Sequence, residues 1–333
     1  MFTKDGKFIK RVTNVLFALI TLLYCFVSAC SCEDALPEVV AVKCEESFSV
    51  QFIDVGNGDS IFIRFPDGKT MLIDCGEPSD TVFRNITSVI DAYGVSQIDY
   101  LVLTHPDIDH VGNANSVIEK YYVNTAFVPN IYDKQSYTEF SSALSALQSK
   151  GALIKYSSPY IFLEGSGYYL AFLSPCAENQ GDYYGEFNSS VTPDDQMVND
   201  LSPIIYLEYA GVRFVFTGDA GVEQERRVLE RYDAGIYDAI HRGKVNLRDV
   251  DFLKVGHHGS LDCSSDEFLY VLKPRNAVFS VGGNNNYGHP STITLTRLIY
   301  SNPSVNFLRT DVYGTIGVGV SPSGETKIYK QSQ

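Results

Sequence analysis

The chain has 333 residues, 44% of them hydrophobic, so it is long enough to bury the core of one large domain. Its formal net charge is −14 at pH 7, with 40 acidic against 26 basic side chains. This balance argues against a protein that binds nucleic acid through a basic face.

The first thirty residues are typical of an export signal, because four basic residues precede an uncharged apolar stretch over residues 12–29. The stretch ends in Val27-Ser-Ala-Cys30, which resembles the lipobox of bacterial lipoproteins, whose cysteine is acylated. We therefore predict a signal or anchor segment over residues 1–32 and an exported lipoprotein attached to the membrane through Cys30. An uncleaved anchor and plain secretion remain open alternatives.

Residues 33–47 are acidic and patternless, which predicts a linker, and a single domain is expected over residues 48–333. Four scattered cysteines fall in or next to this domain and form neither a disulfide scaffold nor a C-x-x-C zinc site. Of these, Cys75 follows a predicted strand and is expected to be a small buried residue.

The first half of the domain alternates short β-rich runs with amphipathic segments. A β-meander is predicted over 48–54, 61–65 and 70–74, and a helix follows from Asp80, taken as its cap, to about Ala92. The next predicted elements are a strand over 98–103, a helix over about 113–121, a strand over 124–128 and a helix over about 136–149.

The second half repeats this alternation. Predicted strands cover 152–155, 168–173, 204–209, 212–216 and 252–255, with a helix over about 223–232. A long polar loop is expected between Cys176 and Asp200, whose aromatic residues Tyr183, Tyr184 and Phe187 could cover a substrate. The pattern predicts an α+β fold, an αββα sandwich in which two mixed sheets pack face to face between outer helices.

The segment Thr104-His-Pro-Asp-Ile-Asp-His110 follows the strand over 98–103 and presents His105, Asp107, Asp109 and His110 from one turn. Imidazoles and carboxylates gathered in this way are typical of a metal site. The other candidates also stand at or just after the ends of predicted strands: Asp54, Asp74, Asp219, His257 and His258. Because the ends of neighbouring strands can meet at one rim of a sheet, we expect these side chains to converge.

These motifs resemble those of the metallo-β-lactamase superfamily, and among its branches the ComEC-type competence-protein hydrolase domain. The resemblance rests on several segments in the family's order, which together span roughly residues 48–320: Asp54-Val-Gly-Asn-Gly-Asp-Ser60, Leu72-Ile-Asp-Cys-Gly76, Thr104–His110, Thr217-Gly-Asp219, Leu253–Ser260, Asn286-Tyr-Gly-His-Pro290 and Arg309-Thr-Asp311.

The resemblance implies a site with one or two divalent ions. Its ligands would be His105, Asp107, Asp109, His110, Asp219 as the bridging carboxylate, and His257 or His258, of which His257 is favoured. Asp109 would also orient or deprotonate the attacking water. Asp54, Asp59 and Asp74 are expected to brace the site through hydrogen bonds. His289 is expected either to contact the substrate or donate a proton, or to be a turn residue, and Asp311 is more commonly a cap.

The chain departs from the family at one ligand. The only histidine between His110 and His257 is His241, which lies past Asp219, and the matching stretch offers Asn199, Asp200 and Ser202 instead. One metal position is therefore expected to be weak. Zinc is the ion that the resemblance favours, whereas the carboxylate-rich ligand set also suits manganese or magnesium.

The expected activity is metal-dependent hydrolysis of a phosphodiester by activated water. The alternatives are a β-lactam or thioester hydrolase, or a non-catalytic metal-binding surface lipoprotein. The acidic charge favours a small phosphodiester over a large polyanion, and nucleic acid remains an open substrate. A monomer is expected. In DNA-uptake proteins this domain is accompanied by a multi-span channel region, which this sequence lacks, so a role in transformation does not follow from the resemblance.

Overall fold

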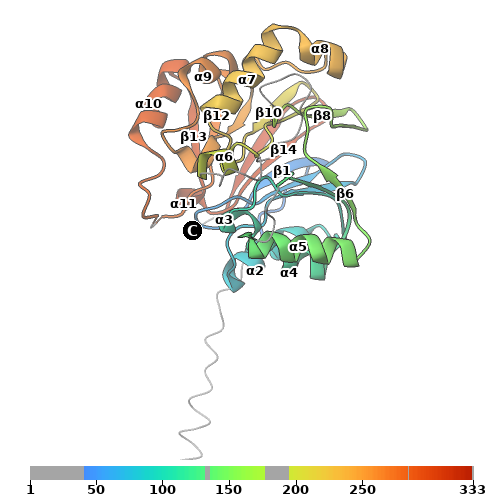
Figure 1. Ribbon diagram of the computed structural model, residues 1–333. Coiled ribbons are helices and arrows are strands. Elements are labelled where there is room, and N and C mark those ends of the chain that lie inside the picture. Colours follow the sequence, from blue (N-terminus) through green and yellow to red (C-terminus); the bar gives the residue numbers. More distant parts are fainter. Residues whose placement is uncertain (1–40, 132–135, 177–194, 284, 332–333) are drawn as a thin grey trace, which may run out of the picture. The chain divides into compact units, whose positions relative to one another are not determined.

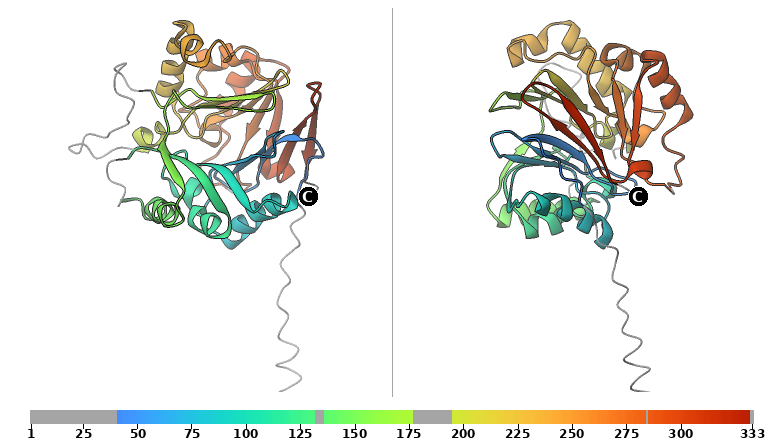
Figure 2. Two further views of the ribbon diagram at one scale, coloured as in Figure 1. Left: turned by 90° about the vertical axis from the view of Figure 1, so that its right-hand side faces the viewer. Right: turned by 180° about the vertical axis from the view of Figure 1, so that it is seen from behind.

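Two β-sheets pack face to face, and helices cover the outer face of each sheet (Figures 1 and 2). This computed structural model describes residues 41–131, 136–176, 195–283 and 285–331. All of them belong to one compact unit, Val40–Gln333. The predicted αββα sandwich is therefore confirmed.

The first sheet has eight strands among the described residues. In spatial order they are β15 (Thr326–Lys330), β14 (Ile316–Val320), β1 (Phe48–Phe52), β2 (Ile61–Arg64), β3 (Thr70–Ile73), β4 (Gln97–Val102), β5 (Tyr122–Val128) and β6 (Leu153–Tyr156). Neighbours are antiparallel from β15 to β3 and parallel from β3 to β6. The predicted meander forms β1 to β3 of the antiparallel part, and the sequence analysis did not predict β14 and β15, which complete it.

The second sheet has seven strands within the described ranges. Their spatial order is β13 (Asn306–Arg309), β12 (Asn276–Phe279), β11 (Phe252–Lys254), β10 (Val212–Phe216), β9 (Ile205–Tyr209), β8 (Tyr168–Phe172) and β7 (Phe162–Glu164). Neighbours are parallel from β13 to β10 and antiparallel from β10 to β7. Each sheet therefore has a parallel half, and the carboxyl ends of those strands carry the candidate ligands.

The helices divide between the two outer faces (Figure 1). Helices α2 (Asp80–Ala92), α4 (Ala114–Lys120) and α5 (Thr138–Ser149) pack on the first sheet. Helices α7 (Val222–Asp233), α8 (Ile236–His241), α9 (Asp266–Leu272) and α10 (Thr292–Ser301) pack on the second. The connections in the described ranges contain four shorter elements: α3 (Ile108–Val111), α6 (Asp195–Asn199), α11 (Thr310–Tyr313) and a 3₁₀ turn over Gly256–Gly259.

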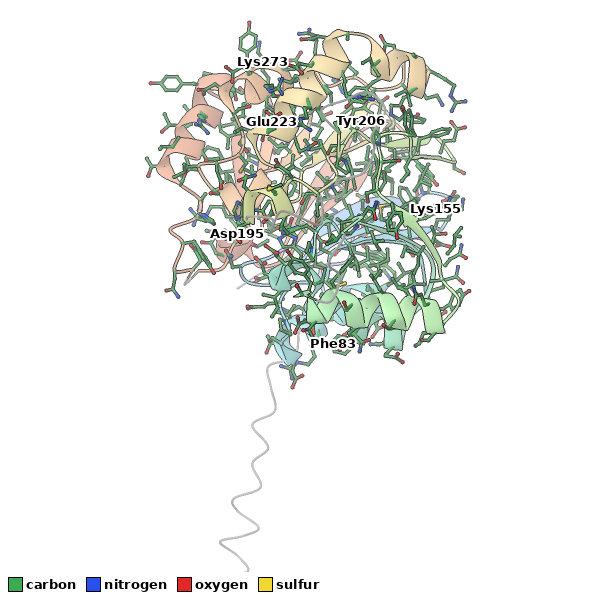
Figure 3. The ribbon with its side chains drawn as sticks, viewed as in Figure 1. Phe83, Lys155, Asp195, Tyr206, Glu223 and Lys273 are labelled. Atoms are coloured by element: carbon green, nitrogen blue, oxygen red, sulfur yellow. The ribbon has the colours of Figure 1, made fainter. Side chains whose placement is uncertain are left out.

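Successive side chains of a strand point to opposite faces of its sheet, so the buried apolar residues form three layers: one between the sheets and one under the helices on each outer face. Phe48, Val50 and Phe52 of β1 face the second sheet, where Phe48 stacks on Tyr209 with ring centroids 4.7 Å apart. Inner strands are buried on both faces, as Tyr206 of β9 is, whereas Lys155 lies exposed on β6 at the sheet edge (Figure 3). A charged residue on an edge strand disfavours pairing with a further strand.

The structure corrects several details of the sequence analysis. The cap of α2 is Ser79, whose side chain accepts hydrogen bonds from the N–H groups of Thr81 and Val82, so Asp80 is the first helical residue. Part of the expected long loop forms α6, and the three-residue β7 was not predicted because its pattern is too short to read. The four cysteines among the described residues, including Cys75, are buried with free thiols.

The packed part of the chain begins before the expected boundary at Phe48. Val42 and Cys44 are buried, and the backbone N–H of Cys44 donates to the Tyr93 hydroxyl at 2.8 Å. The predicted lipidation site Cys30, most of the predicted linker, and Tyr183, Tyr184 and Phe187 lie outside the described residues. Every helix in the described ranges is too short or too polar to cross a bilayer.

Candidate metal centre

Candidate ligands from both sheets meet where the parallel strands end. Asp74 follows β3 and His105 follows β4 in the first sheet, whereas Asp219 follows β10 and the histidine pair follows β11 in the second. The ligating atoms of His105, His110 and Asp219 all lie within 4.8 Å of one another. The expected convergence of segments more than 100 residues apart is therefore present in the structure.

The turn after β4 brings His105 and His110 together. Asp107 stands before the short helix α3, and the two imidazole rings lie 4.1 Å apart between centroids. Nε2 of His105 lies 3.6 Å from Oδ2 of Asp107 and 3.9 Å from Oδ2 of Asp219. Its other nitrogen, Nδ1, lies 3.2 Å from the hydroxyl of Ser202, which fixes the orientation of the ring.

His110 is held from behind by Asp74. Nδ1 of His110 lies 2.8 Å from Oδ2 of Asp74, while Nε2 lies 3.3 Å from Oδ2 of Asp219. Asp74 in turn accepts hydrogen bonds from the backbone N–H and the hydroxyl of Thr104 at 2.8 and 2.6 Å. Burial opposes protonation of His110, but the carboxylates of Asp219, Asp74 and Asp109 outweigh it and raise the pKa of this imidazole.

Asp219 lies at the centre of the cluster. Its backbone N–H donates to the Ser202 hydroxyl at 3.2 Å, and the preceding Gly218 adopts a φ of +51° against the side chains of Ser202 and Thr104. Any side chain at Gly218 would strain this turn. Burial raises the pKa of Asp219, yet the nearby imidazoles of His110, His258 and His257 lower it well below the usual range.

His258, rather than the favoured His257, turns into the cluster. Its Nδ1 lies 2.8 Å from the Ser280 carbonyl oxygen, and its Nε2 lies 3.4 Å from Asp109 and 3.6 Å from Asp219. His257 is more exposed, with Nε2 3.8 Å from Asp219 and Nδ1 3.4 Å from Asp262. Asp109, His110 and His258 form a second group whose ligating atoms lie within 4.8 Å of one another.

The donor set suits a divalent cation. Nε2 of His105, His110 and His258 and Oδ1 of Asp219 are all buried without a hydrogen-bond partner among the described residues. Buried polar atoms without partners are rare in folded proteins because each carries a desolvation cost. Three imidazole nitrogens facing carboxylates are ligands that bind zinc and related ions. The residues present therefore fit the expected ion.

A buried ion pair supports the loop that carries Asp59. Oδ2 of Asp59 lies 2.8 Å from Nζ of Lys254, and both side chains are almost fully buried. The backbone N–H of Asp59 donates to the Asp109 carbonyl oxygen at 3.3 Å, and the adjoining Gly58 leaves no room there for a Cβ. Sequence reasoning missed Lys254, although a lysine inside the buried strand β11 was a visible signal.

Asp54 and Asp311 belong to none of the candidate metal-binding groups in the described part of the chain. Asp54 accepts a hydrogen bond from the Gly56 N–H at 3.2 Å and so shapes the loop before Asp59. Burial, together with the charge of Asp311, raises the pKa of Asp54. Asp311 itself pairs with Arg309 through two contacts of 2.9 and 2.6 Å. The expected bracing role of Asp54 is thus limited to its own loop.

The stretch that replaces the family's additional histidine has a supporting role. Ser202 contacts both His105 and Asp219, and Oδ1 of Asp200 accepts a hydrogen bond from Gly221 N–H at 2.9 Å. Oδ1 of Asn199 is buried without a partner within the described ranges. His241 lies elsewhere, with Nδ1 3.1 Å from the Tyr169 hydroxyl.

His289 stands beside the cluster at its more exposed side. Its ring lies 5.7 Å from that of His257 and stacks on the exposed Tyr287 at 5.8 Å. Asn285 holds this turn by accepting from the His289 backbone N–H at 2.8 Å. Burial, with the neighbouring His257 and His258, lowers the pKa of His289, and its buried Nδ1 has no partner in the described part of the chain.

The sequence profile of the metallo-beta-lactamase superfamily matches residues 53–283, which is more than half of the chain. The chain belongs to this superfamily. Its relatives include ComE operon protein 3 of Bacillus subtilis (strain 168), 29% identical over 282 residues, or 80% of this chain and 32% of the relative. Competence protein ComA of Neisseria gonorrhoeae is 26% identical over 301 residues, or 88% of this chain and 36% of the relative.

These relatives confirm the resemblance to the ComEC-type branch, although the chain spans only about a third of their length. Solved structures with a similar arrangement include the metallo-β-lactamase fold protein YhfI of Bacillus subtilis, with 10% identity and a TM-score of 0.46, covering 85% of this chain and all of YhfI. Another is CmlA, a diiron β-hydroxylase of Streptomyces venezuelae, with 12% identity and a TM-score of 0.47, covering 87% of this chain and 55% of CmlA.

Proposed function

We propose that this superfamily member is a hydrolase that depends on a divalent metal ion and acts on a small phosphodiester. One observation carries the proposal: three buried imidazole nitrogens face Asp219 at the rim where both sheets end, and none has a hydrogen-bond partner among the described residues. His105, His110, His258 and Asp219 would hold the ion, with Asp107 and Asp109 as additional oxygen ligands. When bound, such an ion lowers the pKa of water toward neutrality and stabilises negative charge on a phosphoryl oxygen.

Asp109 is the residue best placed to position water. Its carboxylate is partly exposed and lies 3.4 Å from Nε2 of His258. Burial raises the pKa of Asp109, but the imidazoles of His110 and His258 outweigh this and hold it below its usual range. The carboxylate is therefore ionised at neutral pH and can accept a hydrogen bond from water, which orients a lone pair toward the substrate.

His289 serves as a substrate contact in this proposal. Because its pKa is lowered, the ring is neutral at pH 7 and offers one N–H donor and one acceptor. A neutral imidazole can donate a hydrogen bond to a phosphoryl oxygen. It is less suited to act as the general acid that protonates a leaving group. His257, which is also partly exposed and faces the same side, can contribute a second contact.

The charge of the chain favours a small substrate. A net charge of −14 repels an extended polyanion, whereas a single phosphodiester can be neutralised by the ion and the imidazoles. Nucleic acid remains an alternative substrate to be tested, because the relatives are named ComE operon protein 3 and competence protein ComA. We also propose zinc as the resident ion, with manganese and magnesium as alternatives, and export with attachment to the membrane through residues 1–32.

A hydrolysis screen tests the proposal. The purified chain, loaded separately with zinc, manganese and magnesium, is offered phosphodiester, phosphomonoester, β-lactam, thioester and single-stranded DNA reporters. We expect turnover of the phosphodiester and its loss in Asp109→Ala, with unchanged circular dichroism. Asp99→Ala, on β4 outside the cluster, serves as the matched control. Equal rates for Asp109→Ala and the parent would remove the assignment, and preferential turnover of another reporter would reassign the substrate class.

A further inference from the structure

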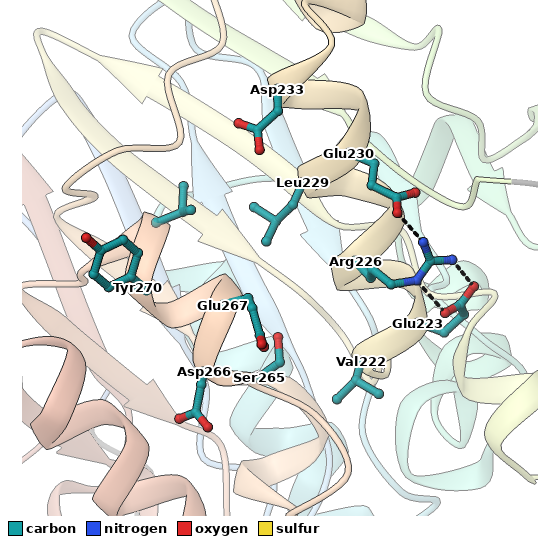
Figure 4. Close-up of a pocket in the computed structure, with 11 residues that line it drawn as sticks. Val222, Glu223, Arg226, Leu229, Glu230, Asp233, Ser265, Asp266, Glu267 and Tyr270 are labelled. Carbon is teal, nitrogen blue, oxygen red and sulfur yellow. Dashed lines mark hydrogen bonds and ion pairs between the residues drawn. The ribbon is translucent and has the colours of Figure 1, made fainter.

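A groove of about 830 Å³ lies between α7 and α9, on the outer face of the second sheet (Figure 4). Its apolar part is formed by Val222 and Leu229 from α7 and by Tyr270 and Val271 from α9. Tyr270 is 68% exposed and Val222 is 45% exposed, although neither takes part in the candidate metal centre. Val222 and Tyr270 lie at opposite ends of the groove in Figure 4, and apolar side chains left exposed along one groove offer a surface that a partner can cover.

Carboxylates surround this apolar surface. Among the described residues, those lining the groove include five with acidic side chains, Glu223, Glu230, Asp233, Asp266 and Glu267, and one with a basic side chain, Arg226. The guanidinium of Arg226 already contacts Glu223 at 2.7 Å and also contacts Glu230, as the dashed lines in Figure 4 show. Asp233 and Glu267 form no ion pair within the described residues, so the groove has an excess of negative charge.

The charge distribution restricts what can occupy the groove. A second copy of this chain, which carries a net charge of −14, or an anionic membrane surface would be repelled. An occupant with an apolar stripe flanked by Lys and Arg would bury Leu229 and Tyr270 and place its cations against the carboxylates. Helix α7 has 12 residues and is about 18 Å long, which accommodates about three turns of a partner helix.

We propose that this groove binds a cationic amphipathic helix of a partner protein. The inference does not depend on the proposed hydrolase activity, since no groove residue is a candidate ligand. The site is nevertheless close to the metal centre along the chain, because α7 begins three residues after Asp219. Glu225 links α7 to the start of α9, because its carboxylate accepts hydrogen bonds from the N–H groups of Ser264 and Ser265, just before α9.

The test uses the full chain in a neutral detergent and a fluorescein-labelled 15-residue helix of leucine and lysine as the probe. Fluorescence anisotropy measures its affinity for the parent, for Tyr270→Ser, and for the double variant Asp233→Asn with Glu267→Gln. A matched control neutralises two exposed carboxylates outside the groove, Asp80→Asn with Glu325→Gln. A leucine and glutamate helix of equal length is the charge-reversed probe. Thermal unfolding followed by circular dichroism checks that each variant is folded.

We expect the leucine and lysine helix to bind the parent about tenfold more tightly than either groove variant, with the control unchanged. The affinity should fall as sodium chloride rises, and the glutamate helix should not bind. Equal affinities for the parent and both groove variants would overturn the proposal, because general charge would then explain the binding. It would also be overturned if the parent dimerised in sedimentation and Tyr270→Ser did not, since a second copy would then occupy the groove.

Discussion

The Asp74 carboxylate lies 2.8 Å from Nδ1 of His110 and therefore decides which nitrogen of that ring faces Asp219. With Nδ1 engaged, Nε2 is the atom available to a metal ion. Carboxylates that orient ligand histidines in this way also increase the basicity of the ring.

Replacing Asp74 with asparagine should weaken metal binding by about 10- to 100-fold while leaving the fold intact. Asparagine tolerates the positive φ of 59° at this position, so the backbone is preserved. The measurement is a competition titration with a chromophoric chelator. Asp99→Asn, a carboxylate of the same sheet outside the cluster, is the control, and an affinity of Asp74→Asn equal to that of Asp99→Asn would contradict the role of Asp74.

Replacing His257 and replacing His258 should have different effects on metal binding and on turnover. His258→Ala removes a nitrogen that faces Asp109 and Asp219, so we expect loss of metal affinity and of turnover together. His257→Ala removes a partly exposed ring, so we expect an increased KM with metal content retained. Metal analysis and steady-state kinetics on both variants check this. The reverse pattern would make His257 the ligand.

The buried pair of Lys254 and Asp59 should be sensitive to the loss of one partner. Lys254→Met leaves the Asp59 carboxylate buried without a cation and should lower the free energy of unfolding by about 3–5 kcal/mol. Lys254→Met combined with Asp59→Asn should recover part of this loss, because no charge is then left unpaired. Urea denaturation of four proteins, namely the parent, Lys254→Met, Asp59→Asn and the double variant, completes a double-mutant cycle. Strictly additive losses would show that the two side chains do not interact.

Glu225 gives a pH dependence that is independent of the metal centre. Burial raises the pKa of its carboxyl to about 6. The folded state therefore binds this proton more tightly than the unfolded state does. The resulting stabilisation is complete below the unfolded pKa, near 4.5, and is lost as the pH rises through about 6.

Between pH 4 and pH 7 the free energy of unfolding of the parent should accordingly fall by about 2 kcal/mol relative to Glu225→Gln, which has no titrating group at this position. Urea denaturation of both proteins at several pH values measures the difference. A difference that stays constant across this range would show that Glu225 does not titrate there.

The sequence predicted the features that depend on local spacing. His105 to His110 come from one turn, and Asp74 and Asp219 follow apolar strands, so their convergence could be inferred from strand ends alone. The orientation of the histidine pair could not. His257 and His258 have φ values of +44° and +54°, so the alternation that holds along a strand does not apply to them.

Other roles depend on tertiary packing. Ser202 contacts His105 across 97 residues, and Ser280 orients His258 through a backbone carbonyl that any residue type would supply. Asp54 stands at a strand end, as the ligands do, yet its carboxylate accepts a hydrogen bond from Gly56 in its own loop. No local pattern distinguishes these cases before the sheets are packed together.

The proposed function requires that His105, His110, His258 and Asp219 hold a divalent ion. The direct measurement is the metal content of the full chain by mass spectrometry after equilibration with zinc, manganese and magnesium and dialysis, compared with that of a double variant, His105→Ala with Asp219→Asn. We expect at least one bound ion per parent chain and almost none in the double variant, with both proteins folded by circular dichroism. Equal metal content in the two folded proteins would contradict it.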